Sequence, residues 1–191
     1  VGFPLIIKPI AGAGSADTYR VDSEQEFGDV LAKMAHVPEV SVEEYIEGRE
    51  LTVGVLGNKR VEISPIWELF MDDLSPGVAN IATSRVKWDP EYQRKIGLRT
   101  GPAEDLDDAT AERIRRTARR IHRAVGLSGY SRIDMRMDRE GQVWILEANP
   151  NPDLCFGEDF AESFERLGYS YPQLIQKILN LGLRYEAPWM G

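Results

Sequence analysis

The sequence predicts an α+β fold dominated by antiparallel strands, and three observations support this. Consecutive strand-like segments between positions 40 and 66 are separated only by short turns, which favours antiparallel pairing. Two further alternating runs flank a short Asp- and Gly-bearing loop at 138–141, which is a hairpin signal. Helical periodicity is confined to other segments, chiefly 24–35, 109–125 and the region after 170.

Composition restricts the classes of function. The 191 residues are 42% hydrophobic and 28% charged, enough for one compact domain or two small ones. The net charge of −8 repels nucleic acid and anionic membranes, so we expect small-molecule partners and neither of these. Two histidines and the single Cys155 argue against a zinc site. Without a membrane-length apolar run or a leader pattern, a cytoplasmic location is expected.

The chain begins directly in an apolar strand, Leu5 to Ile7, which ends in Lys8-Pro9. The segment 10–18 that follows is small, flexible and rich in backbone N–H groups. Such a loop can wrap a phosphate, although a glycine-rich hairpin turn is the commoner explanation and neither common phosphate-loop spacing is met. Because nothing precedes the first strand, we expect the chain to be a fragment.

The next segments alternate between helix and strand. Ser23 to Glu26 has the pattern of a capping box and predicts a helix from about Glu24 to Ala35. Three strands are then expected, at 40–46, 49–56 and 61–66. From Trp67 to Leu106 the periodicity breaks down, and an irregular stretch of this length usually carries function or is ordered by a ligand.

A basic amphipathic helix is expected from about Ala109 to Val125. Six arginines occupy its polar face: Arg113, Arg115, Arg116, Arg119, Arg120 and Arg123. Binding of nucleic acid is the alternative for this face, but no aromatic platform or DNA-binding motif accompanies it. Two more helices are expected, from Asp159 to Leu167 and from Tyr171 onwards.

The hairpin between Ser131 and Asn151 has one face that we expect to be apolar. If Met137 faces Gln142, alternation divides the side chains between two faces. The expected core face is Ile133, Met135, Met137, Trp144, Leu146 and Ala148. The other face carries Arg132, Asp134, Arg136, Val143, Ile145, Glu147 and Asn149.

That second face predicts a site. The oxygens of Asp134, Glu147 and Asn149 are hard ligands of the kind that Mg²⁺ prefers, and Arg132 adds a fixed positive charge beside them. A ladder of surface salt bridges is the alternative, and it is the commoner one for an arbitrary hairpin.

Four blocks occur in one order: Lys8-Pro9 with its glycine-rich loop, Val42 to Val53, Arg132-Ile133-Asp134, and Leu146 to Pro150. Together they resemble the ATP-grasp ligases, most closely the D-alanine–D-alanine ligase branch, over almost the whole chain. The resemblance implies an ATP-grasp fold with antiparallel sheets and packed helices. Residues 1–50 would be part of an incomplete first lobe and residues 51–191 the C-terminal lobe. It also implies a missing N-terminal portion of the same protein as a partner.

The resemblance further implies an ATP-dependent carboxylate–amine ligase that acts through an acylphosphate intermediate. Lys87 would reach the transferred phosphate, and Arg132 would stabilise the oxyanion. The residues implied to bind ATP are Lys8, Gly14, Ser15, Glu43, Glu44, Ile46 and Glu50. The implied ligands of two Mg²⁺ ions, with Mn²⁺ as a substitute, are Asp134, Glu147 and Asn149. The alternative is a noncatalytic ATP-grasp module that has a nucleotide-binding or a regulatory function.

Two positions depart from the branch. Asp153 stands where the branch has a glycine, and Glu158 aligns with a serine that would hold the carboxylate of the second substrate. Two acids near a site would repel a free α-carboxylate and favour a cationic or neutral amine. In the alternative interpretation both side chains point to solvent from a loop.

Overall fold

The computed structural model describes residues 2–12, 14–75 and 78–186. The chain divides into two compact units: unit 1 consists of Val1–Gly48 and Phe70–Arg99, and unit 2 of Arg49–Leu69 and Thr100–Gly191. The lobes expected at 1–50 and 51–191 are a division along the sequence, and they stay a prediction. Within the described ranges, no helix has both the length and the apolar character needed to cross a membrane.

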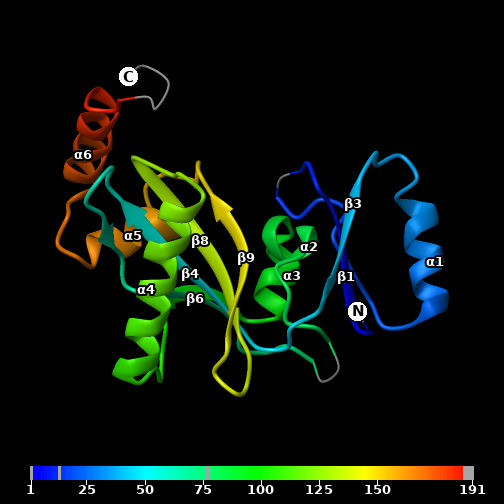
Figure 1. Cartoon of the computed structure of the whole chain (residues 1–191). Coiled ribbons are helices and arrows are strands. Elements are labelled where there is room, and N and C mark those ends of the chain that lie inside the picture. The colour runs from blue at the N-terminus through cyan, green and yellow to red at the C-terminus, as the bar shows by residue number, and fades with distance from the viewer. Residues whose placement is uncertain (1, 13, 76–77, 187–191) are drawn as a thin grey trace. The chain divides into compact units, whose positions relative to one another are not determined.

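Unit 1 contains a three-stranded antiparallel sheet in the order β2-β1-β3 (Figure 1). Its elements are β1 (Leu5–Pro9), β2 (Tyr19–Val21), α1 (Glu24–Lys33) and β3 (Val40–Glu44). Leu5, Ile7 and Val21 form its core together with Val30 and Met34 from the α1 segment. Strand alternation therefore turns Ile6, Lys8 and Glu43 toward the face opposite this core.

The N-terminus of α1 follows half of the expected capping box. Ser23 Oγ accepts a hydrogen bond from the backbone N–H of Glu26, as expected. The Glu26 carboxylate, however, accepts from the N–H of Asp22 at 2.8 Å. The helix ends at Lys33, two residues before the expected Ala35.

The segment from Trp67 to Leu106 is more regular than expected. It contains β6 (Trp67–Met71), α2 (Ser84–Trp88), α3 (Pro90–Lys95) and β7 (Leu98–Pro102). Each of these helices and strands is shorter than the window of about 11–18 residues in which hydrophobic periodicity can be recognised. The sequence pattern therefore did not reveal them.

Side-chain caps nevertheless mark both of these short helices. Thr83 accepts from the N–H of Val86 at the start of α2. Asp89 accepts from the N–H groups of Glu91 and Tyr92 at the start of α3. Both helix starts could therefore have been found from their caps alone.

A larger antiparallel sheet contains the strands of unit 2 in the order β7-β6-β4-β8-β9. The additional strands are β4 (Arg49–Leu56), β8 (Tyr130–Met137) and β9 (Val143–Asn149). The expected third strand at 61–66 is reduced to β5 (Glu62–Ile63), which pairs with the end of β4. The antiparallel sheets and packed helices agree with the expected fold class.

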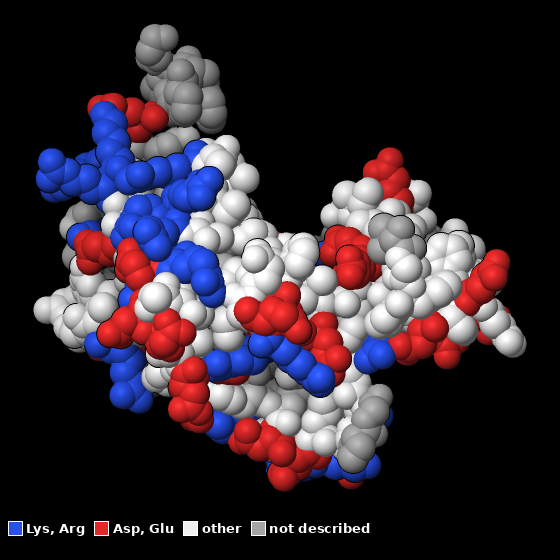
Figure 2. All heavy atoms as spheres, turned by 60° about the horizontal axis from the view of Figure 1, so that its bottom comes forward, with Lys and Arg blue, Asp and Glu red and all other residues white. Residues whose placement is uncertain are grey.

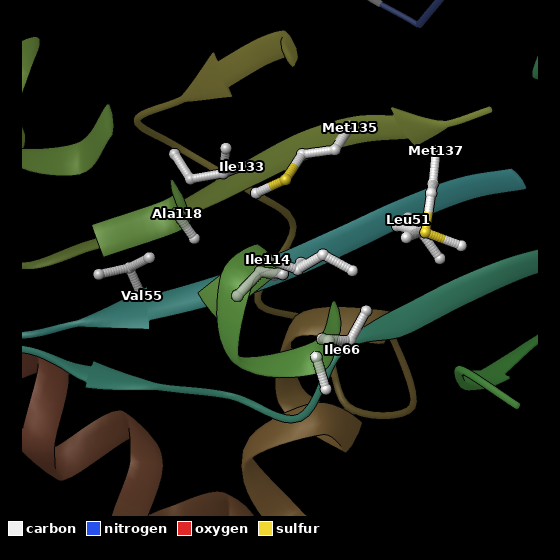
Figure 3. Packing of buried hydrophobic residues seen from close by; sticks show 10 residues of the cluster. Leu51, Val55, Ile66, Ile114, Ala118, Ile133, Met135 and Met137 are labelled. Carbon is white, nitrogen blue, oxygen red and sulfur yellow. The ribbon is translucent and has the colours of Figure 1, made fainter. Parts of the chain in front are cut away.

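The helix α4 (Asp108–Ala124) packs on one face of this sheet. Figure 3 shows side chains of α4, β4 and β8 directed toward one another. Ile114 and Ala118 of the helix are fully buried, as are Leu51, Ile133 and Met135 of the strands. The expected apolar face of the helix is confirmed for Ile114, Ala118 and Ile121, and the odd-numbered core positions of β8 are confirmed as well. Val125, the last residue expected on that face, follows the end of the helix and is exposed.

A second cluster forms where α5 (Asp159–Glu165) and α6 (Tyr171–Leu183) pack against the end of β4. Its large buried members are Leu56, Phe160, Phe164 and Leu174. Gly54 of β4 lies so close to α5 that a Cβ atom there would be 2.7 Å from a ring carbon of Phe164. The absence of a side chain at Gly54 therefore allows α5 to approach the sheet.

The register expected for the hairpin is wrong, because Met137 faces Val143 and not Gln142. Asp138 N–H donates to the carbonyl of Gln142, so the loop has three residues and ends in Gly141 with φ of 77°. Next to the pairs of Asp134 and Met135 the register shifts once more, because Leu146 is an extra residue in β9. The pairing of β8 with β4 continues without a shift.

These shifts change the composition of the two hairpin faces. Trp144 faces Arg136 and is 43% exposed, so it does not belong to the core as expected. Leu146 has no opposing residue and is only partly buried. Val143 and Ala148 pack against the α4 core.

We predict that Gly54→Ala lowers the free energy of unfolding by about 1–3 kcal/mol, because the new methyl group overlaps Phe164. Urea unfolding followed by circular dichroism measures this. Gly182→Ala is the control, since a Cβ atom at that position of α6 meets nothing within 4 Å. Equal stability of the wild type and Gly54→Ala would contradict the close packing of α5.

Candidate functional site

The site predicted on the hairpin lies on the face of the sheet opposite α4. Because residues that face each other across an antiparallel ladder share a side, the pairing places Arg132 beside Asn149 and Asp134 beside Glu147. On the neighbouring strand, Thr52 faces Asp134. The two register shifts leave these pairs on one face, so the structure brings the four predicted hairpin residues together.

Arg132 and Asp134 form a two-point ion pair. Arg132 donates from Nε and Nη2 to the two Asp134 oxygens at 2.7 and 2.8 Å, and both side chains are largely buried. Burial by itself lowers the pKa of Arg132, but Asp134, with smaller contributions from Asp159 and Glu147, outweighs it and raises the pKa above its usual value. The guanidinium is therefore a permanent positive charge in a fixed orientation.

The donor set suits a divalent cation of the Mg²⁺ type. Two carboxylates that face each other repel, and a cation between them removes that repulsion. Glu147 is exposed and has no hydrogen-bond or ion-pair partner in the described part of the chain. Asp134 accepts two hydrogen bonds from Arg132, which leaves acceptor capacity on a carboxylate with about four such positions.

The amide of Asn149 is held by a turn at the end of β9. Its side-chain oxygen accepts from the N–H of Asn151 at 2.8 Å, and Tyr130 donates to the Asn151 side chain at 2.6 Å. Among the described residues, no group of three His, Cys, Asp or Glu side chains is assembled for a metal. The candidate ligands are accordingly two carboxylates and one amide.

Glu50 lies on the same sheet face, on β4. It faces Arg136 of β8 across the ladder, and its Oε2 is 3.3 Å from Nη1 of that arginine. Strand alternation predicted that Arg136 shares a face with Asp134, but no sequence pattern indicated its contact with Glu50, which is 86 positions away. Only the register between β4 and β8 shows that the two residues are neighbours.

The loop after β9 and the start of α5 are acidic. Burial, together with Asp153, Asp159 and Glu162, raises the pKa of Glu158 above its usual value, although Arg132 opposes the shift. The pKa of Asp153 is lowered, first by hydrogen bonds from Cys155 and then by the charge of Arg132. The charge of Arg132 influences the pKa of both acids, so both lie near this arginine. Most of the surface of each acid is nevertheless open to solvent, so the burial that raises the pKa of Glu158 is only partial.

In unit 1, Lys8 and Glu43 form an ion pair of 2.9 Å on the sheet face opposite α1. Glu44 follows Glu43 on β3 and therefore points to the other side of the strand. Ile46 comes after the end of β3 and is partly buried. The structure thus joins Lys8 to Glu43, whereas the side chains of Glu43 and Glu44 diverge.

The glycine-rich loop of unit 1 contacts α2. Gly14 and Ser15 both have positive φ values, 66° and 58°, and for a residue other than glycine this conformation is uncommon outside binding loops and turns. The indole of Trp88 lies against Gly14 and donates to its carbonyl oxygen at 3.3 Å. Lys87, next to Trp88, is exposed, so α2 brings this lysine alongside the loop.

The arginines of α4 mark a different surface. Figure 2 shows Lys and Arg side chains gathered most densely in one patch on the visible face of the molecule. A cavity of about 750 Å³ in unit 2 is lined by Arg115, Arg119, Tyr169 and neighbouring residues. None of the predicted site residues lines this cavity, so it is distinct from the hairpin site.

Comparison with known proteins gives concordant matches. The family model described as "D-ala D-ala ligase C-terminus" matches residues 1–180. A D-alanine–D-alanine ligase of Proteus mirabilis is 29% identical over 187 residues, which are 97% of this chain and 48% of that protein. A protein of Sinorhizobium fredii named "Uncharacterized protein y4sG" is 30% identical over 95% of this chain and 53% of its own length.

Solved structures show the same fold. The VanG D-Ala:D-Ser ligase of Enterococcus faecalis matches with a TM-score of 0.75 and 25% identity, over 95% of this chain and 50% of that one. A D-alanine–D-alanine ligase of Bacillus anthracis, complexed with ATP, matches with a TM-score of 0.75 and 22% identity, over 96% and 53%. The chain spans about half the length of the curated relatives it matches.

Proposed function

The chain belongs to the D-Ala–D-Ala ligase C-terminal family, and on this premise we propose that the protein carrying it is an ATP-dependent carboxylate–amine ligase. In this reaction a carboxylate attacks the γ-phosphoryl group of ATP, and an amine then attacks the resulting acylphosphate. Both steps develop negative charge that fixed cations must neutralise. The observation that carries the proposal is the set of facing pairs Asp134–Glu147 and Arg132–Asn149 on one sheet face.

Each hairpin residue has a part in this proposal. A bound Mg²⁺ would neutralise phosphate charge, and the residues that would hold it are Asp134, Glu147 and Asn149, with two ions as the proposed number. Arg132 would stabilise the oxyanion, because Asp134 holds its guanidinium in one orientation. We propose Mn²⁺ as a substitute for Mg²⁺.

The nucleotide contacts are proposed unit by unit. In unit 1, Lys8 would contact phosphate, backbone N–H groups of Gly14 and Ser15 would cover the phosphates, and Lys87 would reach the transferred phosphate. The positive-φ loop and its contact with α2 support these assignments. The proposed contacts to the adenine edge are Glu43, Glu44 and Ile46. In unit 2, Glu50 would bind the ribose hydroxyls.

A noncatalytic nucleotide-binding module is less well supported. A module that only binds nucleotide has no need of a buried arginine fixed beside a pair of facing carboxylates. Formation of ADP that depends on both an added carboxylate and an added amine tests the ligase proposal, in the protein that carries this chain. Nucleotide binding without any turnover would favour the module. A cytoplasmic location remains part of the proposal, in keeping with the free cysteine at Cys155.

We predict that Glu147→Gln reduces Mg²⁺-dependent turnover by about 100-fold or more, because it removes one of two facing anionic ligands. A coupled assay of ADP release measures the rate. Glu140→Gln is the matched control: it makes the same change on the exposed loop of the same hairpin, and it should leave the rate unchanged. A Glu147→Gln enzyme with the wild-type rate would rule out this carboxylate as a ligand.

We predict that the acceptor is a cationic or neutral amine and not a free α-amino acid such as D-alanine, because Asp153 and Glu158 add negative charge near Arg132. A screen of amines for ADP release decides this. Robust synthesis of D-alanyl-D-alanine would show the prediction to be wrong. Under that outcome both acids act only as solvent-exposed loop residues.

A further inference from the structure

Arg136 is a buried arginine on the face of the sheet that carries the predicted site. Its side chain is 4% exposed, and that of Glu50, directly opposite on β4, is 17% exposed. Removing a guanidinium from water to this extent is costly unless an anion compensates its charge. Nη1 of Arg136 lies 3.3 Å from Oε2 of Glu50. The carboxylate of Glu50 is therefore one of the groups that keep this arginine in place.

The neighbours of Arg136 on this face come from three strands. On this face Arg136 lies between Glu50 of β4 and Trp144 of β9, and Leu69 of β6 faces Glu50 from the other side. The register between β8 and β4 runs without a shift from Asp134 to Arg136, so Arg136 points to the site face and away from the α4 core.

We propose that Arg136 is a positioning residue, which holds the Glu50 carboxylate in the orientation that binds the two hydroxyl groups of a nucleotide's ribose. The inference rests on the proposed function, which assigns the ribose contact to Glu50. A carboxylate has about four acceptor positions, so it can accept from a guanidinium and from a diol at the same time. A hydrogen bond between two charged groups is stronger than one between neutral groups, so the contact with Arg136 favours the Glu50 rotamer that makes it.

The test compares ATP with 2′,3′-dideoxy-ATP, which lacks both hydroxyls, in the protein that carries this chain. We expect Arg136→Met to raise KM for ATP about tenfold with little change in kcat. The reason is that the ribose contact stabilises the bound substrate and the transition state equally. KM for the dideoxy nucleotide should hardly change. The preference for ATP, which is the ratio of the KM for the dideoxy nucleotide to the KM for ATP, should therefore disappear. Arg136→Lys keeps the charge without the planar fork and should restore part of the preference.

A double-mutant cycle shows whether Arg136 acts through Glu50. Glu50→Gln should reduce the preference as Arg136→Met does, and the double variant should lose no more than either single change. The control is Arg116→Met, which removes an exposed arginine of α4 and should leave both KM values unchanged.

Several outcomes would overturn the inference. They include an Arg136→Met protein with an unchanged preference, one that loses kcat alone, or additive effects in the double variant. If the Arg136→Met protein does not fold, the Arg136→Lys protein is measured in its place. A preference for ATP equal to that of the wild type in the Arg136→Lys protein would contradict the proposal. A wild type that turns over ATP without preferring it to the dideoxy nucleotide refutes the role of Glu50 but not the ligase. No ATP-dependent turnover at all refutes the proposed function.

Discussion

The rest of the site depends on one electrostatic constraint, which is the placement of two carboxylates face to face on β8 and β9. Asp134 and Glu147 occupy directly opposed positions of an antiparallel ladder, where like charges repel. Arg132 compensates part of this charge through its two-point contact with Asp134, and it does so in a largely buried position. The remaining negative charge is concentrated at Glu147, which is open to solvent. A divalent cation bound at this place would complete the neutralisation.

The fold makes this arrangement rigid. The opposite face of the same strands is sealed by α4 through Ile114 and Ala118, so the backbone under the site packs against a core with little freedom to move (Figure 3). At the end of β4, Gly54 allows α5 to pack closely against the sheet. Side chains held on a sheet with this backing keep their geometry better than side chains on loops.

Much of this organisation could be predicted from the sequence, and the failures have physical causes. The hairpin and the face shared by Arg132, Asp134, Glu147 and Asn149 follow from strand alternation. Two register shifts, each by one position, leave those pairs on one face but remove Trp144 from the core. A bulge is set by tertiary packing and leaves no periodic signal. The pairing of Arg136 with Glu50 was hidden for a related reason, since it depends on the register between strands far apart in the chain.

We propose that the oxygens of Asp134, Glu147 and Asn149 hold the divalent cation that accompanies the nucleotide. Anomalous diffraction from crystals of the protein that carries this chain, grown with Mn²⁺ and ADP, tests this assignment. We expect a Mn²⁺ peak coordinated by Glu147 and by at least one of Asp134 and Asn149. A Mn²⁺ ion bound with the nucleotide but away from these three side chains would contradict it.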